Sequence, residues 1–547
     1  MKRRLTLVVH VGLLAVMALA MTFAGYRLRE RAWIDTIPIR FRPDMENAWR
    51  WGSIAAKDGY VGLYSKVVVP DRRERNALDY MPLRLGVMTL WAKSRMANGA
   101  KAWTDDYAFN RPLLQFNTLM EWLTAAGLFA LTFDWMRRDA RRRGRPPGWV
   151  LAAWFGLIAA GLAWFNPASL ISAHGRPTWD VWVTPFFVWA VFCCTRNAWM
   201  TAGALLATGA LFKGQELIVV PFFVVWAITQ CRVTPILRWA LGFMVMAGVL
   251  VSPWIVGAST GRIACVIGAA LLVPAVVGVI AWRRKAFSKR MRWVAGFGAI
   301  VGLTLALWTS AALKPGAMDW YTVGIAGGIA KFDGLQVGGA SSLAGILEVD
   351  YGYGVKSPVG FATIGSYTPT LERFMSGMVI LAMIAAGIAA TVYGRRGDAR
   401  FLAAIALPWI AFFALGPRMH ERYLLWGALA SLAAAVALRR EYLLMAIFLT
   451  IAQTVMSLMQ TLSWYGAKAF LADYSPTLGR QIFRIVPPTF PAMGWAIVTV
   501  ALVWLCCALW DVPKLAWEET LAAARSWKIK RQSVRKPVAE SRDVERV

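Results

Sequence analysis

Long apolar runs separated by short polar segments dominate this chain. Many of the runs are roughly 16 to 22 residues long, which is the length that a helix needs to cross a hydrocarbon layer about 30 Å thick. Backbone amides have no water partners in lipid, so each run must satisfy its own hydrogen bonds as a helix. The pattern predicts an all-α polytopic membrane protein, and the 58% hydrophobic content and mean hydropathy of +0.49 agree with it.

We expect about fourteen membrane spans. They cover 5–25, 113–134, 149–166, 179–195, 200–212, 216–230, 238–257, 263–281, 293–312, 375–394, 401–416, 423–438, 441–461 and 491–510. Spans 200–212 and 216–230 are short, and the alternative is a single broken helix with Lys213 in its middle. Counting two spans keeps the basic runs 137–145 and 283–292 on the same side as the basic N-terminus. The positive-inside rule therefore favours fourteen spans with both termini in the cytoplasm.

The charge and the cysteines exclude several classes of function. A net charge of +30 is expected for a protein whose basic residues face anionic inner-leaflet lipid, so nucleic acid is not an expected partner. Segment 1–25 resembles a signal sequence but has a long apolar run and no small-x-small cleavage site, so we interpret it as a retained anchor. The six cysteines show neither a disulfide framework nor zinc spacing. We expect no metal and no cofactor.

Three outer loops are large enough for chemistry: 26–112, 313–374 and 462–490. In the first, apolar residues at helical spacing predict two interfacial amphipathic helices, one from Pro43-Asp44 and one from Pro82. Such helices lie along the membrane surface, where a lipid head group can be reached. Loop 313–374 is rich in glycine, and we interpret it either as a lid or acceptor-binding loop or as a plain connector.

Four pieces of the sequence, in order on one face of the membrane, resemble the GT-C glycosyltransferases. They are Asp44, Gly59, Tyr64 and Tyr80-Met81-Pro82; His174-Gly175-Arg176 with Asp180; Gly203 to Lys213-Gly214-Gln215; and Met419-His420-Glu421-Arg422-Tyr423. The first piece is most similar to the first outer loop of bacterial mannosyltransferase-like members that use a polyprenyl-phosphate sugar. The resemblance covers about the first 260 residues and the patch 417–426.

The resemblance implies a GT-C-like fold and an inverting transferase. It would move a hexose or pentose, with mannose the commonest in the family, from a polyprenyl-phosphate-linked donor to a glycan or glycolipid acceptor. The reaction would take place on the outer face of a bacterial inner (plasma) membrane, among membrane lipids; the oligomeric state is not implied. We divide the chain into a catalytic transmembrane module 1–260, a C-terminal transmembrane module 261–510 and a basic cytoplasmic tail 511–547.

Transfer from a lipid-phosphate sugar requires a base for the acceptor hydroxyl. The phosphate leaves as an anion and needs no acid of its own, so one carboxylate suffices, placed on the ring face opposite the leaving group. Asp44 is our candidate base. The alternatives are that Asp44 only caps the helix that follows it, or that Asp35 or Glu46 is the base instead.

The departing phosphate also requires cations. His420 and Arg422 stand in a short loop between two spans and could bind it, Arg422 with a forked pair of hydrogen bonds. The alternative is an interfacial ion pair between Glu421 and Arg422. Lys213 interrupts an apolar stretch and is predicted to face a cavity rather than to snorkel, because Gln215 and Glu216 follow it.

The second of the four pieces, His174-Gly175-Arg176 with Asp180, offers further ligands for the donor. We assign His174 and Arg176 to the donor phosphate or sugar, and Asp180 to orienting Arg176 or a sugar hydroxyl, the alternative being a helix-start role. One imidazole and one carboxylate six residues apart make at most half of a metal site. Supporting roles are expected for Glu46, Asp180, Gln215, Glu421 and Tyr80. Glu121 lies inside a span and should face the bundle with a partner.

Two other classes of protein remain as alternatives. A polysaccharide polymerase or ligase would more often carry several arginines in one late outer loop, whereas those of 462–490 are scattered. A transporter or flippase for lipid-linked sugars would show an internal repeat in hydropathy, and none is seen in this sequence.

Overall fold

The computed structural model describes most of the chain. The described residues are 2–35, 43–59, 63–64, 78, 80–145, 148–230, 233–256, 319–321, 323–324, 334–337, 339–363, 365–463 and 476–534. Two of the predicted spans, 263–281 and 293–312, lie outside this range. So does the segment 464–475 of the third predicted outer loop.

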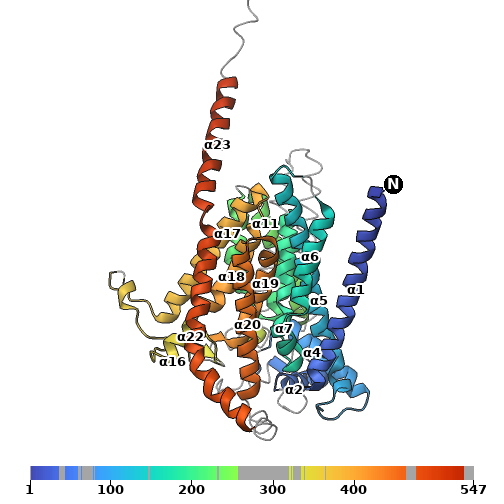
Figure 1. The fold of residues 1–547 in the computed structure, drawn as a ribbon. Coiled ribbons are helices and arrows are strands. Elements are labelled where there is room, and N and C mark those ends of the chain that lie inside the picture. The colour runs from blue at the N-terminus through green and yellow to red at the C-terminus, as the bar shows by residue number, and fades with distance from the viewer. Residues whose placement is uncertain are drawn as a thin grey trace, which may run out of the picture.

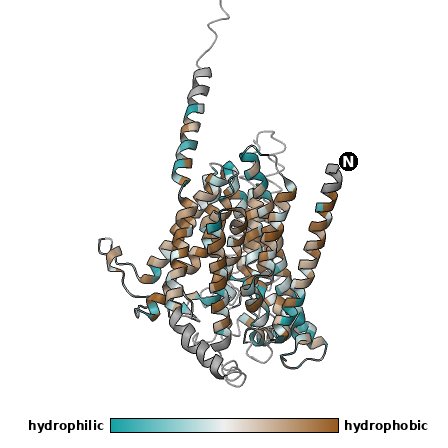
Figure 2. Ribbon diagram, in the orientation of Figure 1, coloured by the Kyte–Doolittle hydropathy of each residue, from teal (hydrophilic) through white to brown (hydrophobic). Residues whose placement is uncertain are grey.

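The described residues form one bundle of helices that lie side by side (Figure 1) and are mainly apolar along their length (Figure 2). Six segments in this part of the chain are long and apolar enough to cross a membrane: Val8–Asp35, Trp149–Gly175, Val233–Val251, Leu371–Arg396, Arg440–Thr461 and Phe490–Ser526. They contain all or part of α1 (Lys2–Asp35), α6 (Trp149–Trp164), α11 (Val233–Val256), α17 (Leu371–Arg396), α20 (Arg440–Ser463) and α22 (Pro476–Leu509), and two of them continue past α6 and α22 into the helical turns that follow. The chain is therefore an all-α integral membrane protein.

Shorter helices fill the middle of the bundle. They are α8 (Thr184–Thr195), α9 (Trp199–Phe212), α10 (Val220–Thr229), α18 (Phe401–Leu415) and α19 (Leu424–Ala437), and the long α5 (Tyr107–Arg142) packs against α6 and α8. Every residue of α18 is buried, because α17, α19 and α22 surround it. A helix that is apolar on all sides needs such surroundings. The twelve predicted spans within the described residues all coincide with helices, although several of these helices are short.

The chain reverses direction between α9 and α10. A 3₁₀ turn, η4 (Gly214–Val219), joins the two helices. Trp199 at the start of α9 and Trp226 near the end of α10 meet, with ring centroids 5.4 Å apart. Two helices that run in opposite directions bring these two rings together. A single broken helix would instead hold them apart by the combined length of α9 and α10. The chain therefore forms two helices here and not one broken helix, and that each of them crosses the membrane stays a prediction.

The bundle has two distinct ends (Figure 1). The N-terminal end of α1 and the helix α23 (Val512–Val534), which forms the described part of the predicted tail, lie at one end. Helices α2 (Pro43–Asp58) and α4 (Pro82–Ala97), which match the two predicted interfacial helices, lie at the other. We call them the α23 end and the α2/α4 end. Helices α2 and α4 pack closely: a Cβ on Gly52 would lie 2.6 Å from the Met88 carbonyl oxygen.

A two-stranded parallel sheet attaches part of the predicted loop 313–374 to the short loop between α18 and α19. Strand β1 (Gln336–Val337) pairs with β2 (Met419–His420), and the Met419 amide donates a hydrogen bond to the Leu335 carbonyl at 3.1 Å. Helix α16 (Leu343–Val349) follows and is capped by Ser342. This segment therefore supports the backbone that carries His420.

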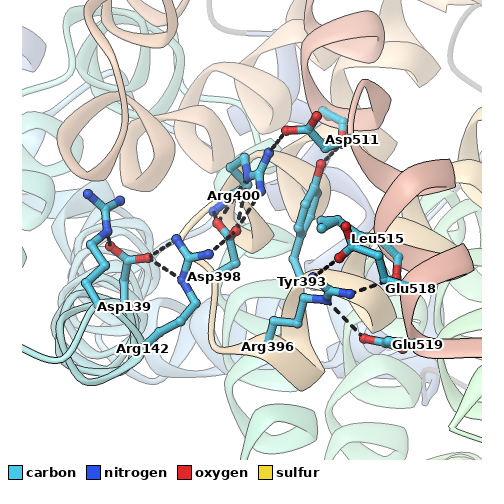
Figure 3. A network of polar contacts seen from close by, with 12 residues as sticks. Asp139, Arg142, Tyr393, Arg396, Asp398, Arg400, Asp511, Leu515, Glu518 and Glu519 are labelled. Atoms are coloured by element: carbon cyan, nitrogen blue, oxygen red, sulfur yellow. Dashed lines mark hydrogen bonds and ion pairs between the residues drawn. The ribbon is translucent and has the colours of Figure 1, made fainter. Parts of the chain in front are cut away.

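An ion-pair network joins the helices at the α23 end (Figure 3). Asp398, in the turn between α17 and α18, pairs with Arg142 of α5 at 3.1 Å and with Arg400 at 2.8 Å. Arg400 also pairs with Asp511 beside α23, and Arg396 pairs with Glu518 of α23 at 3.1 Å. These contacts attach the tail helix to the bundle, although the tail has a basic net composition.

The crossing of α9 and α11 generates a prediction on stability. A Cβ on Gly242 would lie 1.8 Å from the Met200 carbonyl oxygen, and one on Gly203 would lie 1.9 Å from the Trp239 carbonyl oxygen. Close approach of backbones at small residues is a common way to join membrane helices. Gly242→Ala should destabilise the protein by about 1–3 kcal/mol or more, because backbone must move. Thermal unfolding in detergent measures the effect.

Gly248→Ala is the matched control, because Gly248 lies on the same helix and nothing lies within 4 Å of the added Cβ. We expect it to be neutral or slightly stabilising. Equal unfolding temperatures for the two variants would contradict the proposed close crossing.

Candidate functional site

Arg422 is the centre of a charged cluster at the α2/α4 end. It lies in a short 3₁₀ turn, η7 (Glu421–Tyr423), directly after β2. Its Nη1 donates to the Asp44 Oδ2 at 3.0 Å, and its Nε lies 3.1 Å from the Asp180 Oδ2. Asp44 is in the first turn of α2, and Asp180 begins η3 (Asp180–Trp182). One guanidinium thus joins three segments that are far apart in the sequence.

Lys213 enters the same cluster from the turn after α9. Its backbone is extended, and its Nζ forms an ion pair with the Asp180 carboxylate. The ammonium also lies over two aromatic rings, 4.6 Å from the centroid of Tyr423 in η7 and 5.2 Å from that of Trp426 in α19. The side chain is therefore buried inside the bundle and does not snorkel to the surface, while the predicted cavity in front of it stays a prediction.

The aromatic residues around Lys213 are held by hydrogen bonds of their own. The Trp426 Nε1 donates to the Asp180 carbonyl at 2.8 Å, and the Gln215 Nε2 donates to the Tyr423 hydroxyl at 3.2 Å. The rings of Tyr423 and Trp426 stack with centroids 4.9 Å apart. Gln215 thus belongs to the site through Tyr423.

Glu421 connects two further predicted residues. Its carboxylate contacts His420 Nδ1, and its Oε1 lies 3.7 Å from Nη1 of Arg176. The interfacial pair of Glu421 with Arg422, our alternative for this loop, is not among the contacts of the described residues. Arg422 contacts Asp44 and Asp180 instead.

His174 belongs to a different cluster. It lies in the π-helical turn η2 (Ile171–Gly175), and its Nε2 is 2.8 Å from the Glu121 Oε2. The same oxygen accepts a hydrogen bond from Arg29 Nε at 2.7 Å, and Ser169 donates to the other oxygen. Glu121 is thus paired inside the bundle, as predicted. The structure does not place His174 beside the donor-binding candidates. Instead, the contact of His174 with Glu121 holds the turn that precedes Arg176.

Arg84, in the first turn of α4, is a residue of the site that the sequence reasoning missed. Its guanidinium lies 3.8 Å from the ring centroid of Tyr80 and is close enough to act electrostatically on Lys213. Its Nε is buried and has no hydrogen-bond partner among the described residues. Tyr80 is itself held by Tyr64, whose hydroxyl donates to its carbonyl. The only sequence signal was a cation two residues after Tyr80-Met81-Pro82.

Of the three candidate carboxylates in the first outer loop, Asp44 alone joins this cluster within the described residues. Glu46 is exposed, and Asp35 is exposed with Arg31 as its neighbour at 3.8 Å. The Asp44 side chain is 21% exposed, against 1% for Asp180. Asp44 is therefore the carboxylate of the cluster that solvent and small molecules can reach.

The site carries a surplus of positive charge. Four cations, Arg84, Arg176, Lys213 and Arg422, face three carboxylates, Asp44, Asp180 and Glu421. Burial lowers the pKa of Arg422, but Asp180 and Asp44 outweigh this and raise the pKa above its usual value. Burial lowers the pKa of His420 by more than Glu421 raises it. Within the described residues no three His, Cys, Asp or Glu side chains are grouped so that they could hold a metal ion.

No protein-family model matches this chain, and no curated protein matches it either.

Asp180 pairs with both Lys213 and Arg422, and this generates a prediction on stability. Asp180→Asn leaves both Lys213 and Arg422 without their most buried counter-ion, and removing one partner of a buried ion pair costs about 3–5 kcal/mol. Asp44→Asn should cost about 1 kcal/mol or less, because Asp44 is partly exposed and Arg422 keeps Asp180. Thermal unfolding of the two variants in detergent compares them. Equal losses would show that Asp180 is not the main counter-ion.

His420 generates a prediction on pH. Because its pKa is lower in the folded protein than in the unfolded chain, the unfolded chain binds the proton first as the pH falls through about 6.5. Stability should therefore decrease between about pH 7.5 and pH 5.5, and His420→Asn should reduce that decrease. Unfolding temperatures of both proteins across this range give the comparison, and parallel curves would contradict it.

Proposed function

We propose that this protein is a GT-C-type glycosyltransferase. It moves a sugar from a polyprenyl-phosphate donor to a hydroxyl of a glycan or glycolipid acceptor, with Asp44 as the general base. One observation carries the proposal: Arg422 is held between Asp44 and Asp180, so a carboxylate that solvent can reach shares its counter-ion with a buried group of phosphate-binding side chains. A base and an anion site must adjoin in this way for the transfer.

The cations suit a departing phosphate. Arg422, Lys213 and Arg176 converge from three segments, and Arg84 adds a guanidinium whose Nε lacks an acceptor among the described residues. As the bond between the anomeric carbon and the phosphate oxygen breaks, negative charge builds on the phosphate. Fixed donors aimed at that charge stabilise the transition state more than water can.

Donor binding would also activate Asp44. In the structure Arg422 donates a hydrogen bond to Asp44 and forms an ion pair with Asp180. An incoming phosphate competes for Arg422, and Asp44 is the partner more easily displaced, because it is 21% exposed whereas Asp180 is 1% exposed and also paired with Lys213. The released carboxylate can then accept a proton from the acceptor hydroxyl.

The reaction balances with these groups alone. The acceptor oxygen gives its proton to Asp44 and forms a bond to the anomeric carbon, while the bond from that carbon to the phosphate breaks. The polyprenyl phosphate leaves with the electron pair, and its charge is met by Arg422, Lys213, Arg176 and Arg84. Attack on the face opposite the leaving group inverts the anomeric configuration.

Substitution of Asp44 tests the proposal. The purified protein is incubated with a panel of synthetic lipid-phosphate monosaccharides and a glycan acceptor, and mass spectrometry measures free lipid phosphate and extended acceptor. One donor should be consumed, and Asp44→Asn should lower its rate by about 10²–10⁴-fold, because a positioned base contributes about that much. Glu46→Gln, two residues away on the exposed side of α2, is the control and should keep the wild-type rate.

Two results would refute this assignment. Wild-type activity of Asp44→Asn would exclude Asp44 as the base. Movement of intact donor across the membrane of a vesicle, without release of lipid phosphate from any donor in the panel, would identify a carrier instead of an enzyme.

A further inference from the structure

A cavity lies at the α23 end of the bundle, far from the charged cluster. It occupies about 420 Å³ between the ends of α5, α8, α10 and α17 and the start of α9. Trp135, Trp199 and Trp226 line its inner wall, and Arg138, Asn197 and Arg395 line it as well. Nothing in the proposed transfer uses this cavity.

The inner wall is rigid. Trp135 stacks on Phe401 with centroids 4.1 Å apart, and Trp199 packs against Trp226. Asn197 adopts a left-handed backbone (φ 60°), which Asn tolerates better than most residues, and its side-chain oxygen accepts a hydrogen bond from Trp199 Nε1 at 3.0 Å. The cavity is therefore formed before any ligand arrives, so binding needs little reorganisation.

The lining is basic. It contains Arg138 and Arg395, and it contains no Asp or Glu among the described residues. Arg138 is fixed by Asp134 at 2.8 Å and by the Thr195 carbonyl at 3.2 Å, and Arg395 is fixed by Glu519 at 3.3 Å. A guanidinium has five N–H donors, so a group held by such contacts can still point donors at an anion.

One buried donor of the wall lacks an acceptor. The indole Nε1 of Trp135 is buried and has no hydrogen-bond partner among the described residues. Leaving a buried N–H unpaired costs free energy, so such a group is a signal for a ligand or water oxygen. The two arginines, and not this indole, give the hollow its affinity for an oxyanion.

The surroundings identify the source of the oxyanion. Met200, Ile228 and Val233 are exposed apolar residues next in sequence to, or within two residues of, the lining residues Trp199, Gln230 and Pro235. We propose that the cavity binds the phosphate of an anionic phospholipid headgroup, with the acyl chains along this apolar surface. Basic pockets between helix ends bind such lipids in other membrane proteins.

Lipid-binding measurements on the full-length protein test the proposal. The protein in detergent is titrated with phosphatidylglycerol or phosphatidylcholine, and native mass spectrometry counts bound lipid. We expect saturable binding of phosphatidylglycerol that is at least about tenfold tighter than that of phosphatidylcholine, about 1.4 kcal/mol. Arg138→Gln and Arg395→Gln should each weaken it severalfold, because each removes one guanidinium from the lining.

Arg396→Gln is the matched control. Arg396 neighbours Arg395 and also pairs with Glu519, yet it does not line the cavity, so phosphatidylglycerol should bind this variant as tightly as the wild type. Equal affinity for the two lipids would overturn the proposal, and so would equal losses in Arg138→Gln and Arg396→Gln. Complete displacement of the lipid by millimolar inorganic phosphate would assign the cavity to a free anion and overturn the lipid source.

Discussion

Compensation of buried charge is the constraint on which the α2/α4 end of this protein depends. In an apolar helix bundle an unpaired charge is expensive, and attraction between paired charges is strong for the same reason. Arg422 satisfies this constraint by contacting Asp44 and Asp180 together, while Lys213 completes the shell of Asp180. The ends of four helical segments are consequently held at one point.

The two carboxylates that pair with Arg422 differ in burial and in the number of their partners. Asp180 is enclosed by Lys213, Arg422 and the indole of Trp426, whereas among the described residues Asp44 has one ion-pair partner, Arg422, and reaches solvent. A site that can exchange one counter-ion while keeping the rest is suited to a ligand that brings its own negative charge. This is the physical basis of the proposed transfer, in which a phosphate replaces a carboxylate beside Arg422.

Much of the site could be predicted from residue types alone. A lysine or a carboxylate within an apolar run must find a partner, and this reasoning led correctly to a buried Lys213 and a paired Glu121. Residue types alone could not show which side chains would pair with each other. His174 is close in sequence to Arg176 but contacts Glu121, because the π-helical turn between them points the two side chains to different neighbours. Arg84 was missed because a cation on an amphipathic helix usually faces water.

The sequence by itself determined the class of protein, most helix positions and the reversal at Lys213, since these follow from hydrophobic length and from the placement of basic residues. Tertiary structure alone decided which charges meet. Asp44 and Arg422 are 378 positions apart, and no local pattern encodes a contact over that distance. Likewise, the basic cavity at the α23 end arises only where helix ends from separate segments converge, because each contributes one or two lining residues.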